Sequence, residues 1–186
     1  MAKDALSALG IEFLAPPIEF SLCPFWFWND DLSEPEILRQ IADFQAHGVH
    51  AFVIHPRVGL PKEIGWMSEP MLRFIRLAVE EAERRGMWVV LYDEGMYPSG
   101  SSSGQVVAEN PTYQCRGLER RPAGSSVGPG ENVLAGNAVW IIVERPIDSV
   151  IRGLHYIGEG PEEETPPAAD LLNPDAVGCF IRKVVQ

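Results

Sequence analysis

The sequence predicts an α/β fold built on a parallel sheet, and three observations support this prediction. Short apolar runs alternate with amphipathic segments, each run turns polar where it ends, and both amphipathic segments begin with the tripeptide Ser-Glu-Pro. Continuous apolar runs are typical of strands that helices cover on both faces of a parallel sheet. The alternation therefore predicts a β-α-β-α-β arrangement over residues 21–92.

The first half of this arrangement contains two predicted strands and one helix. The first strand is the apolar and aromatic run 21–29. A helix follows, because Ser33 and Glu36 have the spacing of a capping box and Gly48 provides a helix end. The run 49–54 is the second predicted strand.

The pattern then repeats once. Ser68 begins a helix whose apolar residues recur at helical spacing as far as Gly86, and the run 87–92 is the third predicted strand. Glycine, serine and proline become frequent after this run, and strand character returns only over 138–144 and, more weakly, over 150–157. The regular alternation is therefore expected to end after the third strand.

These patterns divide the chain into four segments. We expect an N-terminal extension over residues 1–20, the first βα units of a TIM-type barrel over 21–110, an irregular insertion with β structure over 111–169, and the start of the next helix over 170–186. The chain would then hold the first three to four units of a (β/α)8 barrel, and the remainder, on the same or a partner chain, would be required to complete it. The last helix stops without a cap, which predicts that the chain is cut short.

The composition argues against several classes of function. Fifteen lysines and arginines against 26 aspartates and glutamates give a net charge of −11, which disfavours binding to nucleic acid or to an anionic membrane. The 3 cysteines are far apart and form no CxxC pair, so we expect no metal, no other cofactor and no disulfide framework. No signal peptide and no apolar stretch of ~20 residues is visible, which predicts a cytoplasmic protein.

Polar residues follow each of the three predicted strands. Loops at the carboxyl ends of parallel strands build the active sites of β/α folds. His55 and Arg57 are therefore expected to supply donors for a substrate hydroxyl or carboxylate, and Asn29 to bind substrate hydroxyls. Either Asp93 or Glu94 is expected to act as general acid, base or charge stabiliser, because neighbouring strand residues do not face the same side. A role in turns or caps remains open for the asparagine and the aspartate.

Aromatic residues lie beside the same strand ends. Trp26, Trp28, Tyr92 and Tyr97 offer rings on which the apolar face of a sugar can stack. Core packing is the alternative for some of them, because neighbouring residues of a strand point to opposite faces. The combination of rings and polar groups indicates a carbohydrate ligand.

Four segments together resemble the N-terminal part of the catalytic barrel of the bacterial α-L-rhamnosidase-like glycoside hydrolases. They are SLCPFWFWND, HGVHAFVIHPRVGL, YDEGMYPSG and DLLNPDAVGCF, and the resemblance covers most of residues 15–186. It implies a fragment of an enzyme that hydrolyses plant or microbial glycosides. The residues that it places in or near the sugar pocket are Trp28, Asn29, His55, Arg57, Asp93, Glu94 and Tyr97.

Two alternatives remain open. The chain can be a catalytically incomplete, carbohydrate-binding or vestigial half-barrel that is inactive alone. It can also be a serine esterase, because residues 100–104 match G-x-S-x-G with Ser102 as the nucleophile, and Asp148 and His155 follow in the order of a triad. That motif requires the serine directly between a strand and a helix, and the residues before it do not have strand character.

Overall fold

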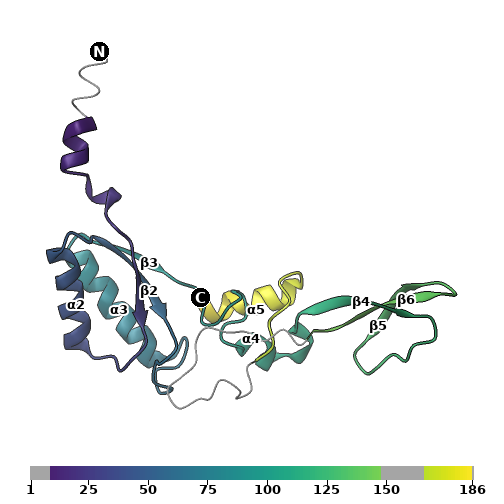
Figure 1. The fold of residues 1–186 in the computed structure, drawn as a ribbon. Coiled ribbons are helices and arrows are strands. Elements are labelled where there is room, and N and C mark those ends of the chain that lie inside the picture. Colours follow the sequence, from purple (N-terminus) through teal and green to yellow (C-terminus); the bar gives the residue numbers. More distant parts are fainter. Residues whose placement is uncertain (1–8, 148–165, 186) are drawn as a thin grey trace. The chain divides into compact units, whose positions relative to one another are not determined.

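The computed structural model of the chain describes residues 9–147 and 166–185, and these divide after Tyr92 into two compact units. Figure 1 shows the helices and strands with the labels used below. Each unit has its own sheet. The two units are described separately.

The first unit is built on a three-stranded parallel sheet. Its strands are β1 (Phe25–Trp28), β2 (Ala51–Pro56) and β3 (Trp88–Leu91), in the order β1-β2-β3. Phe27 lies opposite His55 in the register of the first pair. Strands β1 and β3 fall within the predicted runs, β2 extends two residues beyond the predicted end at residue 54, and the pairing is parallel as predicted.

Two helices cover one face of this sheet (Figure 1). They are α2 (Glu34–Ala46) and α3 (Glu69–Arg84), and both have proline in the first turn. The hydroxyl of Ser68 accepts a hydrogen bond from the backbone N–H of Met71 and so caps α3, whereas the side chain of Ser33 makes no capping bond. A short 3-10 turn, η1 (Ile18–Phe20), precedes the sheet.

The core of the first unit lies between the sheet and these helices. The Trp26 ring packs edge to face against Phe44 of α2 and Phe52 of β2, with centroid distances of 5.5 and 5.2 Å. Burial of such large side chains is the main contribution to the stability of a unit of this size. The other fully or nearly buried apolar residues include Trp28, Ile37, Ile41, Ile54, Met71, Phe74, Ala78 and Ala82.

The second unit combines an antiparallel sheet with short helices. Its elements are α4 (Gln105–Glu109), η2 (Pro111–Tyr113), β4 (Arg116–Pro122), β5 (Asn132–Gly136), β6 (Trp140–Pro146) and α5 (Pro174–Val184). The strand order is β4-β6-β5. The predicted strand 138–144 overlaps β6 and the predicted last helix contains α5, whereas the predicted strand 150–157 lies outside the described residues.

The predicted partial (β/α)8 barrel is wrong. The part of the chain that the structure describes holds one three-stranded parallel sheet and one separate three-stranded antiparallel sheet, and the βα repeat does not continue after β3. A β-α-β-α-β stretch is common to open sheets and to barrels, because each strand needs only its immediate neighbours. The sequence pattern therefore predicts the β-α-β-α-β stretch, but it does not predict whether the sheet closes into a barrel.

Candidate functional site

The face of the parallel sheet opposite the helices carries large apolar side chains that are open to solvent. Phe25, Phe27, Trp88 and Val90 are 55, 49, 64 and 48% exposed, respectively. All four side chains lie on the same face of the sheet, as the parallel register of β1 with β2 and of β2 with β3 shows. Contiguous exposed apolar surface of this kind marks a site of interaction. We call it the open face.

An aromatic cluster lies at the carboxyl end of the open face. The rings of Phe25 and Phe27 are nearly parallel, with an interplanar angle of 8° and centroids 6.2 Å apart. The His55 ring meets both edge to face, at 5.0 and 5.2 Å, and stacks on Tyr92 at 4.1 Å. Strands β1 and β2 and the end of β3 each contribute to this cluster.

His55 is the polar centre of the cluster. Its side chain is 7% exposed, and its Nδ1 lies 3.0 Å from the carbonyl oxygen of Pro56. A carbonyl oxygen only accepts, so this contact assigns the proton of the neutral ring to Nδ1 and makes Nε2 the acceptor nitrogen. An acceptor nitrogen beside exposed aromatic rings suits a hydroxyl donor.

Arg57 lies at the edge of the cluster. Its guanidinium carbon is 5.8 Å from the centroid of the Phe27 ring, within the range of a cation–π contact. The backbone N–H of Arg57 donates to the carbonyl oxygen of Trp28 at 2.9 Å, which extends the β1–β2 pairing by one step. The base of this side chain is therefore held by the sheet.

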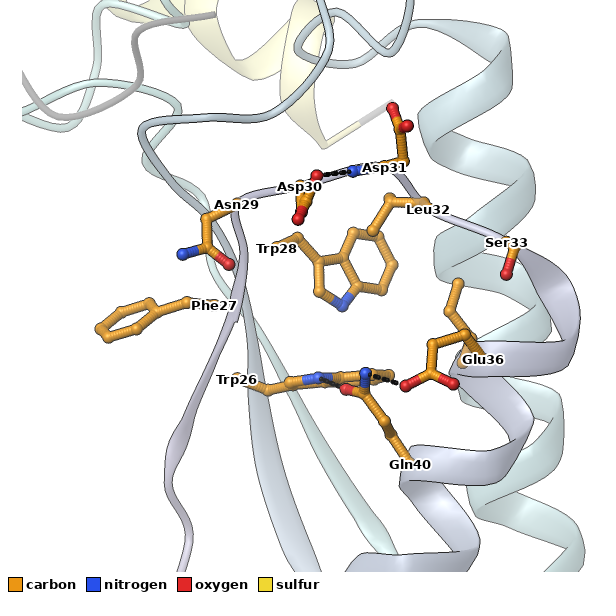
Figure 2. A pocket seen from close by; sticks show the side chains of 11 residues that line it. Trp26, Phe27, Trp28, Asn29, Asp30, Asp31, Leu32, Ser33, Glu36 and Gln40 are labelled. Carbon is orange, nitrogen blue, oxygen red and sulfur yellow. Dashed lines mark hydrogen bonds between the residues drawn. The ribbon is translucent and has the colours of Figure 1, made fainter. Parts of the chain in front are cut away.

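Figure 2 shows a recess on the other side of β1, between that strand and α2. Its volume is about 80 Å³. The indole Nε1 of Trp26 donates to Gln40 Oε1 at 2.7 Å, and Gln40 Nε2 donates to Glu36 at 2.7 Å. Hydrogen bonds from Arg39 and then Gln40 lower the pKa of the Glu36 carboxyl to about 2. Trp26, Gln40 and Glu36 are thus engaged with one another, whereas the buried indole Nε1 of Trp28, which also lines the recess, has no hydrogen-bond partner among the described residues.

Trp28 is a core residue of the first unit. It is 2% exposed and packs edge to face against Trp26, with centroids 5.5 Å apart. Figure 2 shows both indoles on the side of α2, and Phe27 and Asn29 on the opposite side of the strand. Trp28 and His55 therefore lie on opposite faces of the sheet, although the resemblance places both in or near one sugar pocket.

The remaining predicted site residues belong to the second unit. Asp93 accepts a hydrogen bond from the Ser99 hydroxyl at 2.8 Å, and Tyr97 is 57% exposed. Glu94 lies in the same segment without regular structure. The structure thus brings His55 and Arg57 together, with Asn29 on the same side of β1 as Phe27, and places the two predicted catalytic carboxylates in the other unit.

Ser102 has an environment that differs from that of a catalytic serine. Its side chain is 2% exposed, and its hydroxyl donates to the amide oxygen of Gln105 at 3.0 Å. The residues before it form no strand, although its φ of +48° resembles a tight turn. Asp148 and His155, the expected partners, lie outside the described residues. The geometry around Ser102 gives the esterase hypothesis no support.

Sequence reasoning missed Phe25 and Phe27 as site residues. The signal was present, because residues two apart in a strand share a face and Phe27 is the register partner of His55. Tyr92 was expected near the strand ends, and the structure confirms that it contacts His55. Phe25 and Phe27 are assigned to the open face once Trp26 and Trp28 are assigned to the helix-covered face.

Within residues 9–147 and 166–185, no three histidine, cysteine, aspartate or glutamate side chains gather as a metal site would require. None of the helices in the described ranges combines the length and apolarity needed to cross a membrane. No protein-family model, no curated protein and no solved structure matches the chain.

Proposed function

We propose that the first unit binds a glycoside on the open face, at the cluster of Phe25, Phe27, His55, Arg57 and Tyr92. The observation that carries this proposal is the pair of nearly parallel, half-exposed phenylalanine rings beside a histidine and an arginine. Sugar rings have apolar C–H faces and a rim of hydroxyl groups, so aromatic surface next to hydrogen-bonding groups suits them.

The polar groups of the cluster provide both acceptors and donors for the hydroxyl groups of a sugar. His55 contributes Nε2, the acceptor nitrogen of its neutral ring, at the centre of the aromatic cluster. Arg57 donates to hydroxyl or other oxygen atoms through its five N–H groups. Asn29, whose side chain lies on the same side of β1 as Phe27, provides a donor and an acceptor at the end of the strand.

Hydrolysis of the bound glycoside is the second part of the proposal. It follows the resemblance to the α-L-rhamnosidase-like family, in which two carboxylates flank the glycosidic bond. Asp93 and Glu94 are our candidates for assistance with charge, since they follow directly on Tyr92. Binding without hydrolysis is the alternative, because the cluster itself contains no carboxylate.

The test is calorimetric titration of the full chain with methyl α-L-rhamnoside and a panel of neutral and acidic oligosaccharides. We expect Phe27→Ala to weaken binding about threefold to tenfold, because a stacked ring contributes roughly 0.5–1.5 kcal/mol. Trp88→Ala is the matched control, since Trp88 is an exposed aromatic residue of the same face at the opposite end of its strand register. Equal losses for both variants, or no binding by the unmodified chain, would contradict the proposal.

Hydrolysis is tested separately with 4-nitrophenyl α-L-rhamnoside. Turnover that Glu94→Gln abolishes while sugar affinity is retained would support a catalytic carboxylate. Binding without turnover would favour the alternative of a carbohydrate-binding protein.

A further inference from the structure

Two hydrogen bonds fix the backbone of Arg57. Its backbone N–H donates to the Trp28 carbonyl at 2.9 Å, and its carbonyl accepts from the N–H of Leu60 at 3.2 Å. The Leu60 side chain is fully buried and anchors this turn. The guanidinium therefore projects from a fixed backbone position beside the Phe27 ring.

The guanidinium of Arg57 has no counter-charge within residues 9–92. It forms no ion pair and no side-chain hydrogen bond there, and its contact is with the face of Phe27. Four other arginines of the same unit lie against glutamates, with N–O distances from 2.5 to 3.9 Å. They are Arg39, Arg73, Arg84 and Arg85. The donors of Arg57 therefore face solvent at the edge of the sugar-binding cluster.

The charge of this edge contrasts with that of the chain as a whole. The protein carries a net charge of −11, but the cluster consists of Phe25, Phe27, Tyr92, a histidine and the arginine. A neutral hydroxyl uses few of the five donors of a guanidinium, whereas a carboxylate matches its planar fork with two parallel hydrogen bonds. One guanidinium also balances the single charge of one carboxylate.

We propose that the open face selects an acidic sugar, a hexuronate residue whose carboxylate pairs with Arg57 while its ring stacks on Phe25 and Phe27. This inference rests on the proposed function and narrows it to one class of glycoside. The attraction is strongest where the ligand displaces water from the aromatic rings, because the effective dielectric constant falls there.

The test compares two ligands that differ only in this charge. Trigalacturonate and its fully methyl-esterified form are titrated into the full chain at low and at high salt. We expect the acid to bind about tenfold more tightly than the ester, since a charge-assisted pair contributes more than a neutral hydrogen bond. Added salt is expected to reduce this preference by screening.

Variants of two arginines test whether the preference for the acid over the ester depends on Arg57. Arg57→Gln is expected to remove the difference between acid and ester, because it weakens binding of the acid about tenfold more than binding of the ester. Arg76→Gln is the matched control, because Arg76 is an exposed arginine of α3, and this variant is expected to retain the full preference.

Each remaining outcome is decisive. Equal affinity for acid and ester overturns the inference and leaves the proposed glycoside binding intact. Absence of binding to both, and to every other sugar of the panel, overturns the proposed function and the inference with it. If acetate alone competes as well as trigalacturonate, Arg57 is a general anion contact and the inference is also overturned.

Discussion

Gly59 controls the position of the loop that carries Arg57. Its φ is +104°, and a Cβ atom at this position would lie 2.4 Å from the carbonyl oxygen of Asn29 and 3.3 Å from its carbonyl carbon. Both neighbours are backbone atoms at the end of β1, so they cannot move aside without disturbing the strand. A glycine is therefore required for two independent reasons, the left-handed backbone and the close approach.

Replacement of this glycine gives the first test at the scale of one residue. We expect Gly59→Ala to lower the free energy of unfolding by roughly 2–4 kcal/mol, because strain and a backbone clash add together. Gly48→Ala is the matched control, since Gly48 has a φ of +77° but no atom within 4 Å of its added Cβ, and it is expected to cost only about 1 kcal/mol. Urea unfolding measures both, and equal costs would show that the contact with Asn29 is unimportant.

The residues of the site were only partly predictable for a reason visible in β1. The run FWFW alternates aromatic residues on both faces, and hydropathy alone does not say which pair meets the helices. In the structure, the side chain of Gln40 on α2 accepts a hydrogen bond from Trp26. This contact shows that the face of β1 that carries Trp26 packs against α2. His55 and Arg57 were predictable from strand order, whereas Phe25 and Phe27 needed the tertiary contact.

At the scale of elements, α2 and α3 are joined near their carboxyl ends by a hydrogen-bond network of Gln45, Glu81, Arg84 and Arg85, which we call the polar clamp. Glu81 accepts hydrogen bonds from Arg84 at 2.6 and 2.8 Å and from Arg85. Arg85 in turn donates to the side chain of Gln45 at 2.9 Å, and Gln45 donates to the Arg85 carbonyl at 3.0 Å. These bonds, from Arg84 first, lower the pKa of Glu81 to about 2.

The clamp predicts a pH-dependent stability. A carboxyl whose pKa falls on folding contributes stability above its unfolded pKa of ~4.3, and the contribution is lost as the pH falls toward the folded value of about 2. We expect Glu81→Gln to lower the Tm by about 2–4 °C at pH 7, equivalent to about 1 kcal/mol. The difference from the unmodified chain should shrink between pH 4.5 and 2.

Thermal unfolding followed by circular dichroism measures this difference across the pH range. Glu83→Gln is the control, because Glu83 is an exposed glutamate of the same helix without a described ion pair. A Tm difference for Glu81→Gln that is the same at pH 7 and pH 2.5 would contradict the role of its charge.

The elements themselves were predictable to different degrees. Helices α2 and α3 begin after the expected serines, because proline in the first turn is a strong local signal. Strand β4 was missed, since its sequence RGLERRP has no apolar alternation. Its register with β6 depends instead on charged partners, for example Glu119 with Arg145 at 2.7 Å. Such pairing is invisible until the strands are adjacent.

At the scale of the whole molecule, the prediction failed where it extended beyond local pairing. The parallel order β1-β2-β3 follows from the alternation of apolar runs and capped helices. The continuous apolar runs also predicted helices on both faces of the sheet, whereas α2 and α3 cover one face and Phe25, Phe27 and Trp88 are exposed on the other. The closure of a barrel does not follow, because the same alternation also builds an open sheet. After Tyr92 the chain forms a second unit with an antiparallel sheet, for which the sequence offered only β6 as a recognisable strand.

The open face also has a thermodynamic consequence. Unfolding normally raises the heat capacity by about 12–15 cal/mol/K per residue, because buried apolar groups become hydrated. Phe25, Phe27, Trp88 and Val90 are already about half hydrated or more in the folded chain, so they contribute little to this change. We therefore expect the heat capacity of unfolding per residue to lie at or below the lower end of this range. A ligand that covers these rings binds with a negative change in heat capacity.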